Sequence, residues 1–397
     1  MAEVNVTPEL RFPEFNEEWA AKKLGNIFEM KSGSFVPAKE IENEPGPNLY
    51  PCYGGNGLRG YTKSFTHEGR YNLIGRQGAL CGNINLVSGT FHATEHAVVV
   101  ANNDNYDIDF VYYILNNLRL NRLATGQAQP GLSISILDSV KFYATKLAEQ
   151  QKIATFLKAI DQRIQLLQKK KAKLEEYKKG VMQKLFSQEI RFKDENGNDF
   201  PDWEEKKLGE IGEFKTSSVD KKIDEKLPMV YLVNYMNVYR HETISNANRD
   251  NLMQVSATET QLVSNDLKKG DILFTPSSET PSDIGHSVVI FEDLENTLYS
   301  YHLMRFRPTI DIDLMYSHYF CNIPSVLKQI SSFATGSTRF TISVDSFSKI
   351  QVSLPTLPEQ KKIAASLTSL DKSIESVEEE IEGTITFKKG LLQKMFV

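Results

Sequence analysis

The sequence predicts an α+β protein: two mixed α/β domains separated by a long antiparallel two-helix coiled coil, a dumbbell with approximate twofold symmetry. Three observations predict this architecture. Several segments recur along the chain at constant offsets, the two longest recurring segments carry the heptad pattern of a coiled coil, and the sequences between them contain short apolar runs that are typical of strands.

The recurring segments divide the chain into two units. At an offset of 210 residues, 149–154 (EQQKIA) recur as 359–364 (EQKKIA), 178–186 (KKGVMQKLF) recur as 388–396 (KKGLLQKMF), and 124–126 (ATG) recur as 334–336. At an offset of 184 residues, Trp19 and 22–25 (KKLG) recur as Trp203 and 206–209. The residues between, roughly 26–123 and 210–333, show almost no similarity. The two units therefore share their ends and differ in their middles.

The coiled coil is predicted by positions that alternate steps of four and three, which we call the seam of each helix. The first seam comprises Ile153, Leu157, Ile160, Ile164, Leu167, Lys171, Leu174, Lys178, Val181 and Leu185. The second comprises Ile363, Leu367, Leu370, Ile374, Val377, Ile381, Thr384, Lys388, Leu391 and Met395. Neither run contains proline. The alternative is a helix that lies on its own domain, but a stripe of about 33 residues and about 50 Å is longer than one small domain covers.

The order of the segments predicts that the two helices are antiparallel. The first helix leaves the first domain and enters the second, and the second helix leaves the second domain. We therefore expect a first domain at 1–148, a spacer helix at 149–187, a second domain at 188–358 and a second spacer helix at 359–397. Strands are expected at 72–74, 97–100, 271–274 and 287–291, and helices at 110–123 and 314–330.

The order of these features resembles the specificity subunit of type I restriction-modification systems. It consists of a variable domain, an Ala-Thr-Gly segment, a Glu-Gln-x-x-Ile-Ala helix start and a Gly-x-x-Gln-Lys-x-Phe helix end, all repeated, and it covers almost the whole chain. The resemblance implies two target-recognition domains that each read one half of a bipartite site in double-stranded DNA. It also implies helices that set the gap and dock two DNA adenine methyltransferase subunits and, through them, restriction subunits. The methyl donor, ATP and Mg are then expected on those partners, and no cofactor on this chain.

Polar side chains in glycine-rich or short polar loops are the candidates for DNA contact, because Arg pairs with guanine and Asn or Gln with adenine in the major groove. In the first domain the candidates are Asn56, Arg59, Arg76 and Gln77. In the second domain they are Asn237, Arg240, Ser277 and Ser278, and Gln129 and Arg339 are weaker candidates for contact with the DNA backbone. For each of them a surface ion pair or a phosphate contact is the alternative to base reading.

The charge of the chain predicts weak DNA binding by the isolated protein. The formal net charge is −5, and residues 187–358 carry 17 Lys or Arg against 25 acidic residues. Because neutralisation of phosphates supplies much of the affinity of DNA-binding proteins, we expect partner subunits to make many of the phosphate contacts.

The sequence gives little support to a catalytic site. The sequence has no phosphate-binding loop and no Asn-Pro-Pro-aromatic tetrad of amino-methyltransferases. Residues 92–96 (HATEH) match an HxxEH zinc pattern, but that pattern requires a helix, and the run that follows predicts a strand. Acidic residues at 202–205 with Lys206 lie too close in sequence for a nuclease site on adjacent strands. The alternatives to a DNA-specificity subunit are a coiled-coil adaptor with no nucleic-acid role and, with the least support, a metal hydrolase.

The compartment is expected to be the cytoplasm. The first eight residues lack the pattern of a signal peptide, and no apolar stretch is long enough to span a bilayer. Cys52, Cys81 and Cys321 are odd in number and far apart, which is typical of thiols in a reducing compartment.

Overall fold

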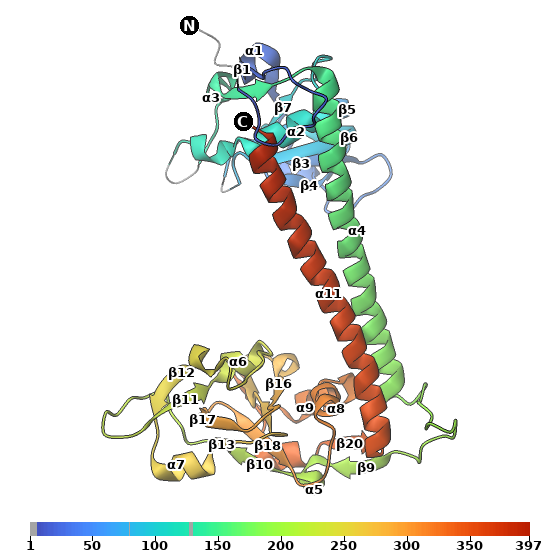
Figure 1. Ribbon diagram of the computed structural model, residues 1–397, viewed down its shortest axis with the longest axis vertical. Coiled ribbons are helices and arrows are strands. Elements are labelled where there is room, and N and C mark those ends of the chain that lie inside the picture. Colours follow the sequence, from blue (N-terminus) through green and yellow to red (C-terminus); the bar gives the residue numbers. More distant parts are fainter. Residues whose placement is uncertain (1–5, 79, 127–129) are drawn as a thin grey trace. The chain divides into compact units, whose positions relative to one another are not determined.

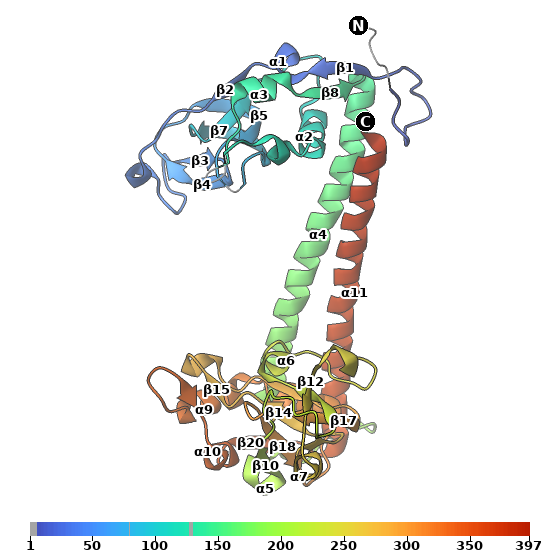
Figure 2. The same cartoon turned by 90° about the vertical axis from the view of Figure 1, so that its left-hand side faces the viewer.

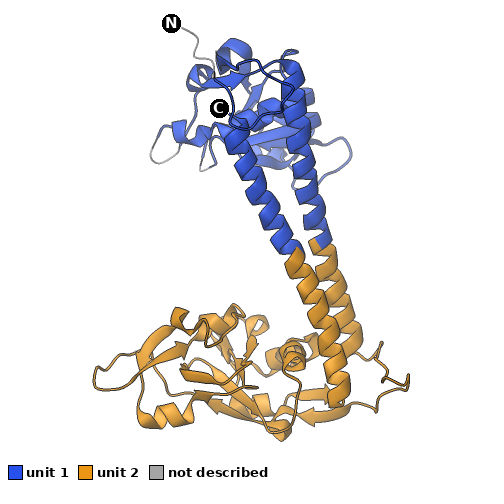
Figure 3. Cartoon of the chain, in the orientation of Figure 1, with its two compact units in different colours: residues 1–170, 377–397 blue, residues 171–376 orange. Residues whose placement is uncertain are grey.

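The computed structural model describes residues 6–78, 80–126 and 130–397. It divides into two compact units, shown in different colours in Figure 3: unit 1 contains residues 1–170 and 377–397, and unit 2 contains residues 171–376. The division falls inside both long helices, α4 (Leu147–Phe186) and α11 (Leu357–Met395). Each unit therefore consists of one globular domain and one half of each long helix.

The unit 1 domain is built on a six-stranded sheet with the strand order β2-β7-β5-β6-β3-β4. Its strands are β2 (Met30–Ser32), β3 (Tyr50–Gly54), β4 (Gly57–Thr62), β5 (His67–Gly75), β6 (Ile84–Ala93) and β7 (Ala97–Val100). Its shorter helices are α1 (Leu24–Ile27), α2 (Ile108–Asn117) and α3 (Ile134–Ser139), with 3-10 turns at Ala38–Glu40 and Leu120–Leu123. The predicted strands at 72–74 and 97–100 are thus parts of β5 and β7. Helix α2 packs on β5 and β6 and lies between the sheet and α4 (Figure 2).

The unit 2 domain contains two four-stranded sheets with the orders β10-β18-β14-β16 and β12-β11-β17-β13. Its strands are β10 (Gly212–Thr216), β11 (Met229–Val233), β12 (Met253–Ser256), β13 (Asp266–Leu267), β14 (Ile272–Phe274), β15 (Ser277–Ser278), β16 (Ser287–Val289), β17 (Leu294–Tyr299), β18 (Met304–Pro308) and β19 (Phe340–Thr341). Its helices are α5 (Leu208–Ile211), α6 (Tyr235–Tyr239), α7 (Glu259–Ser264), α8 (Leu314–Phe320), α9 (Pro324–Phe333) and α10 (Val344–Ser348), with 3-10 turns at Arg249–Asn251 and Pro281–Asp283. The predicted helix at 314–330 is therefore two helices. The break precedes Pro324, whose ring cannot continue the preceding helix and which instead begins α9.

A pair of antiparallel strands closes each domain next to its long helix. In unit 1, β1 (Ala20–Lys23) pairs with β8 (Lys141–Ala144), and in unit 2, β9 (Glu204–Lys207) pairs with β20 (Gln351–Leu354). The recurring tryptophans precede β1 and β9 and lie in the cores. Trp19 contacts Phe396, the last aromatic of the second repeat, with ring centroids 6.2 Å apart, and Trp203 contacts Phe186 at 6.3 Å. The end of each long helix is thus fixed in the domain that it reaches.

In each unit the two long helices run antiparallel, as the sequence predicts (Figures 1 and 3). In unit 1 the seam residues Ile153, Leu157 and Ile160 of α4 share one core with Leu391 and Met395 of α11. In unit 2 Leu185 of α4 shares a core with Ile363 and Leu367 of α11. The remaining predicted seam residues are buried (Leu167, Val377, Ile381) or half-buried (Ile164, Lys171, Leu174, Lys178, Val181, Leu370, Ile374, Thr384, Lys388). The ends of the seams also pack on the domains, because Phe110 and Ile114 of α2 belong to the same core as Leu157.

Buried polar residues attach the start of each long helix to its domain. The Glu149 carboxylate accepts two hydrogen bonds from the Arg11 guanidinium at 2.6 and 2.7 Å, and Glu359 accepts two from Arg191 at 3.1 and 2.8 Å. The Gln150 Oε1 atom accepts from the Asp107 backbone at 3.0 Å, and the Gln360 Oε1 atom accepts from the Asp313 backbone at 2.9 Å. Because Asp107 and Asp313 are themselves the N-caps of α2 and α8, each glutamine connects its long helix to the start of a domain helix. The recurring Glu-Gln dipeptide is therefore a structural anchor.

Within the described ranges, no helix has the length and apolar character that a membrane span requires, and no cluster of three or more potential metal-binding side chains occurs. The three cysteines are buried and unpaired.

Candidate nucleic-acid interface

A pocket of about 390 Å³ lies among the glycine-rich loops of unit 1. We call it the glycine-loop pocket. It is lined by Gly54, Gly55, Asn56, Gly57, Leu58, Arg59, Gln77, Gly78 and His96. Three segments form it: the β3–β4 hairpin, the loop that follows β5, and the turn between β6 and β7 that carries His96. Gly75 lets the first two segments approach each other, because a Cβ atom at this position would lie 2.2 Å from the Gly55 carbonyl oxygen.

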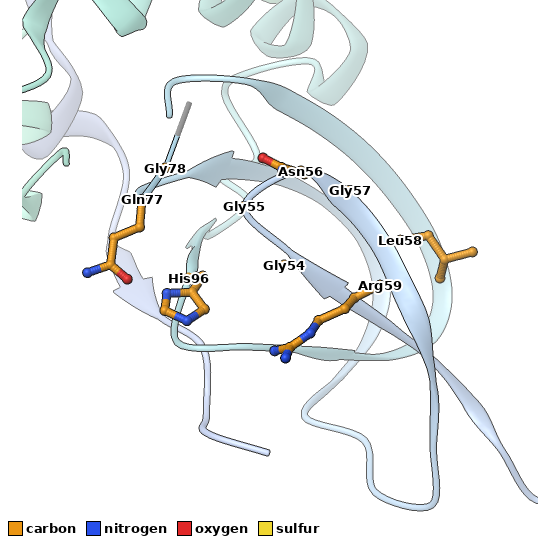
Figure 4. Close-up of a pocket in the computed structure, with 9 residues that line it drawn as sticks. All are labelled: Gly54, Gly55, Asn56, Gly57, Leu58, Arg59, Gln77, Gly78 and His96. Carbon is orange, nitrogen blue, oxygen red and sulfur yellow. The ribbon is translucent and has the colours of Figure 1, made fainter. Parts of the chain in front are cut away.

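Three of the predicted DNA-contact residues, Asn56, Arg59 and Gln77, line this pocket. In Figure 4 the Arg59 side chain extends toward the side of the pocket where the His96 ring lies, and the Leu58 side chain points the opposite way. The three side chains are exposed and make no hydrogen bond to any residue that the structure describes. Their donors and acceptors are thus available for the edges of bases.

Arg76 does not line the glycine-loop pocket, although it was predicted together with its neighbour Gln77 to contact DNA. Its guanidinium donates a hydrogen bond of 2.6 Å to Ser32 Oγ, and its Nε atom is buried without a partner in the described part of the chain. This geometry favours a structural role for Arg76 next to the sheet rather than a contact with a base.

A second pocket, of about 470 Å³, lies in unit 2. We call it the tyrosine pocket. It is lined by Tyr235, Met236, Tyr239, Ser278, Glu279, Asp283, Thr338 and Arg339. Helix α6 presents its two tyrosines on one face, because they are four residues apart, and their rings stack at 5.8 Å. Arg339, which directly precedes β19, donates to Ser277 Oγ of β15 at 3.2 Å. The pairing of β15 with β19 thus brings Ser278 and Arg339 to the same pocket.

Of the other candidates of unit 2, Ser278 lines the tyrosine pocket, whereas Asn237, Arg240 and Ser277 lie outside its lining. The Asn237 side chain accepts from the Asn234 backbone at 2.9 Å and donates to Glu242 at 2.6 Å, so it caps α6. Arg240 ends the same helix, is exposed and lies 3.9 Å from the Glu242 carboxylate. Ser277 and Ser278 are buried, and Ser278 Oγ donates to Asp283 at 3.4 Å. Gln129 lies outside the described residues.

The two pockets differ in their charge. Asp283 in the tyrosine pocket is 2.9 Å from Nε2 of His286, and the second ring nitrogen of His286 lies 3.1 Å from His241. Burial raises the pKa of Tyr235, so its hydroxyl remains protonated and donates to the Ser277 carbonyl at 3.1 Å. The tyrosine pocket thus offers carboxylates and aromatic faces, whereas Arg59, His96 and amides line the glycine-loop pocket.

The pockets nevertheless occupy equivalent places in the repeated frame. The Ala-Thr-Gly segments begin matching hairpins, in which Thr125 pairs with Gly131 and Thr335 pairs with Thr341. Each hairpin then pairs with a residue at or next to a pocket: Gly131 pairs with Gln77, which lines the glycine-loop pocket, and Thr341 pairs with Ser277, the neighbour in sequence of Ser278 in the tyrosine pocket. The glycine recurs because Gly126 and Gly336 both have positive φ, which side chains disfavour. Two unlike pockets are thus held at one position of a common scaffold.

The HxxEH segment does not form the helix that a zinc site of this type needs. His92 is the second-last residue of strand β6, and its two ring nitrogens lie 2.9 Å from the Ser34 carbonyl and 3.1 Å from Ser64 Oγ. Glu95 and His96 follow in a turn, where Nδ1 of His96 has no hydrogen-bond partner among the described residues. His96 instead lines the glycine-loop pocket.

Several pocket residues are absent from the sequence-based candidates. These are Tyr235, Met236, Tyr239, Glu279, Asp283, Thr338 and His96. The spacing of Tyr235 and Tyr239 is a signal that could have found two of them, since residues four apart share a helix face. Met236 lies on the same helix, and Thr338 reaches the pocket through the pairing of β15 with β19, which are distant in the sequence.

Comparison with known proteins identifies the family. The model of the type I restriction modification DNA specificity domain matches residues 16–176 and again residues 201–385. The chain belongs to this family. The two matches correspond to the two repeats, so each unit contributes one specificity domain. The predicted resemblance to specificity subunits of type I systems is therefore confirmed.

Relatives with similar sequences carry the same description. The chain is 42% identical over 153 residues to the EcoprrI specificity subunit of Escherichia coli, a match that covers 38% of this chain and 38% of that subunit. It is 25% identical over 408 residues to the MjaVIII specificity subunit of Methanocaldococcus jannaschii, covering 96% of this chain and 92% of the relative.

Solved structures share the fold. The S subunit of a type I restriction-modification system from M. genitalium aligns with a TM-score of 0.60 and 18% identity, over 99% of both chains. A chain from a structure concerned with complex assembly and conformational transition of the type I R-M system aligns with a TM-score of 0.58 and 15% identity, over 95% of this chain and 96% of that one. The predicted fold class, two mixed α/β domains with two long helices, is confirmed.

Proposed function

We propose that the chain reads a bipartite DNA site, one half-site with each specificity domain, and that the two half-sites differ in sequence. The observation that carries this proposal is the equivalent placement of two unlike pockets beside the Ala-Thr-Gly hairpins. A shared scaffold places the two readers in the same way, and different side chains give them different targets. We assign the first reader to residues 1–148 and the second to residues 188–358, with spacer helices at 149–187 and 359–397.

The chemistry of the pockets supports different base preferences. Arg59 offers a forked donor pair that matches O6 and N7 of guanine, and Asn56 and Gln77 match the N6 and N7 edge of adenine. In the tyrosine pocket the carboxylates of Glu279 and Asp283 suit the N4 amino group of cytosine instead. Arg339 is the cation of this pocket and suits a phosphate or a guanine. These assignments predict an asymmetric recognition site.

The charge of the chain supports the participation of partners in DNA binding. With a formal net charge of −5, the subunit alone neutralises few phosphates. We propose that two DNA adenine methyltransferase subunits supply much of the phosphate contact and that restriction subunits join through them. The chain itself then needs no catalytic site and no cofactor, and the methyl donor, ATP and Mg belong to the partners. Such a complex acts on cellular DNA, so we place it in the cytoplasm.

An exposed aromatic residue on each long helix supports docking of two copies of one partner. Tyr177 of α4 and Phe387 of α11 are equivalent in the repeat, with 61% and 57% of their surfaces exposed. The twelve positions that precede them, 165–176 and 375–386, contain no identical pair. An exposed ring does little for the stability of the helices, so its presence in both copies indicates contact with something outside the chain.

The experiment that tests the recognition function is methylation mapping of DNA from cells that express this chain with its methyltransferase. We expect two unlike half-sites separated by unspecified bases. A palindromic or continuous methylated motif would contradict the proposal.

The docking function is tested by copurification of the methyltransferase with Tyr177→Ala, Phe387→Ala and the double variant. We expect each single change to weaken one docking site and the double change to abolish stable assembly. Leu166→Ala is the matched control, because Leu166 is 66% exposed on the same helix but corresponds to Ser376 in the other repeat. Equal loss of the partner in the control and in the double variant would refute the assignment.

A further inference from the structure

The same three-residue arrangement of lysine, aspartate and tyrosine occurs once in each unit. In unit 1 the Asp161 carboxylate of α4 forms an ion pair with Lys388 of α11 and accepts a hydrogen bond of 2.7 Å from the Tyr113 hydroxyl of α2. The Lys388 ammonium also lies 5.5 Å from the centre of the Tyr113 ring. We call this arrangement the unit 1 clasp. It joins both long helices and a helix of the domain.

The unit 2 clasp has the same chemistry with the roles of the long helices exchanged. The Asp371 carboxylate of α11 pairs with Lys178 of α4 and accepts a hydrogen bond of 2.6 Å from the Tyr319 hydroxyl of α8. Lys178 lies 5.3 Å from the centre of the Tyr319 ring. The pairs Asp161 and Asp371, and Lys178 and Lys388, are separated by the repeat offset of 210 residues.

Each clasp places a lysine at a seam position, where packing alone favours an apolar side chain. Lys178 and Lys388 both occupy the seam, and each side chain is only 22% exposed. Burying the stem and much of the ammonium costs free energy unless a partner compensates for it. Polar residues at single seam positions of coiled coils are known to lower stability and to select one alignment of the helices. Each clasp is a polar contact of this kind, at a single position of one seam.

The apolar part of the seam distinguishes poorly between alignments. A slide of one helix by seven residues again brings Leu, Ile and Val opposite one another, since the pattern has a period of seven. The same slide moves each lysine by about 10.5 Å relative to its aspartate, at 1.5 Å per residue, which is beyond the reach of an ion pair. Both clasps would be lost together, leaving partly buried charges without partners.

We propose that the two clasps fix the axial alignment of α4 against α11 and that this alignment determines the gap between the two half-sites. This inference rests on the proposed reading of a bipartite site. Lys178, Asp371, Lys388 and Asp161 are then positioning residues for specificity: they touch no base, and they set how many unspecified base pairs separate the bases that are read.

The test uses the chain in complex with its methyltransferase and maps the methylated sites. The variant that removes both clasps is Lys178→Met with Lys388→Met, because methionine keeps length and suits an apolar seam. We expect unchanged half-sites and an increase of about tenfold in the share of methylated sites with a gap other than the parental one. Arg163→Met is the matched control. It removes the ion pair of Arg163 with Glu380, which is exposed, lies outside the seam and has no counterpart in the other repeat.

A charge exchange keeps the proposal testable if the double methionine variant is unstable. Lys178→Asp or Asp371→Lys alone brings like charges together, and we expect a lower thermal midpoint and relaxed gap selection. The combined exchange restores an ion pair and should recover both the thermal midpoint and the selection of the parental gap. The proposal is overturned if the assembled variant without clasps methylates only the parental gap. It is equally overturned if the combined exchange is as unstable as the two single changes added together.

These outcomes are separable from failure of the proposed function. If the unaltered chain methylates a site that is not bipartite, the recognition function fails before the clasps are tested. If it methylates a bipartite site and the variants do not change the gap, only the clasp proposal fails.

Discussion

Lengthening both long helices by four residues should lengthen the unspecified gap without changing either half-site. The insertions belong after Lys170 in α4 and after Ser376 in α11, the positions at which the chain passes from one unit to the other. Both residues are exposed. Insertion at these points leaves the Lys178–Asp371 pair on one side and the Asp161–Lys388 and Arg163–Glu380 pairs on the other. The polar contacts within each unit are thus kept.

The size of the change follows from helix geometry. Four residues at 1.5 Å each add about 6 Å, and B-DNA rises about 3.4 Å per base pair, so the gap should grow by one or two base pairs. The rotation added to the helix has the same sense as the rotation added to the DNA. Four residues advance an α-helix by about 40° beyond a full turn, and one base pair rotates right-handed DNA by about 34–36°. Coiled coils absorb four-residue insertions by local unwinding, so some loss of stability is expected.

The assay is methylation mapping of DNA from cells that express the lengthened chain with the methyltransferase. Insertion into α4 alone is the control, because it shifts the two seams against each other and should destabilise the protein. A folded, active variant with both insertions that still methylates only the original gap would refute the idea that the helices measure distance. They would then only tether the two domains.

Three further predictions concern single residues. Arg59→Ala should weaken or relax only the half-site that unit 1 reads, and Arg339→Ala only the other, by about 1–3 kcal/mol for a lost bidentate contact. Glu359→Ala should destabilise unit 2, and Glu149→Ala unit 1, by about 3–5 kcal/mol in thermal or denaturant unfolding, since each change leaves an arginine without its buried partner. Burial lowers the pKa of His318, so the imidazole takes up a proton at lower pH in the folded state than in the unfolded state. The stability that is present above about pH 6.5 should therefore decline as the pH falls through the folded-state pKa of His318.

Each of these predictions has a result that would contradict it. Base preference that changes in both half-sites after Arg59→Ala would mean that the readers are not independent. Unfolding of Glu359→Ala within about 0.5 kcal/mol of the parent would show that the buried pair is not an anchor. His318→Gln should flatten the acid limb of the stability profile, and an unchanged slope would place the responsible proton elsewhere.

The architecture could be predicted from the sequence because its determinants are local and repeated. A seam with a seven-residue period identifies a long helix without knowledge of its neighbours. Two such seams in one chain, related by a constant offset, indicate that the two helices pair with each other. The strands β5 and β7 were predictable for the same reason, since the runs at 72–74 and 97–100 are apolar and bounded by turn residues. The break between α8 and α9 was predictable in principle from Pro324.

The candidate site was only partly predictable, because its residues meet through long-range strand pairing. Gly-rich loops indicated Asn56, Arg59 and Gln77, and these three do share a pocket. The local sequence does not distinguish Arg76 from its neighbour Gln77. Gln77 lines the pocket, whereas Arg76 donates a hydrogen bond to Ser32, which lies 44 residues earlier in the chain. Asn237 is likewise a cap of α6, a role that depends on where the helix begins.

The polar contacts of the frame explain how two different readers can share it. Glu149 and Glu359 bond to Arg11 and Arg191 from the segments that lead into the domains, and the following glutamines bond to the backbone that starts α2 and α8. None of these partners lines the glycine-loop pocket or the tyrosine pocket. The readers join the frame at the Ala-Thr-Gly hairpins through backbone pairing, which any side chain permits except at the glycine of positive φ. Substitutions in a loop can therefore change which DNA bases it reads without disturbing the helices. Changes in helix length can likewise alter the gap between the half-sites without disturbing the loops.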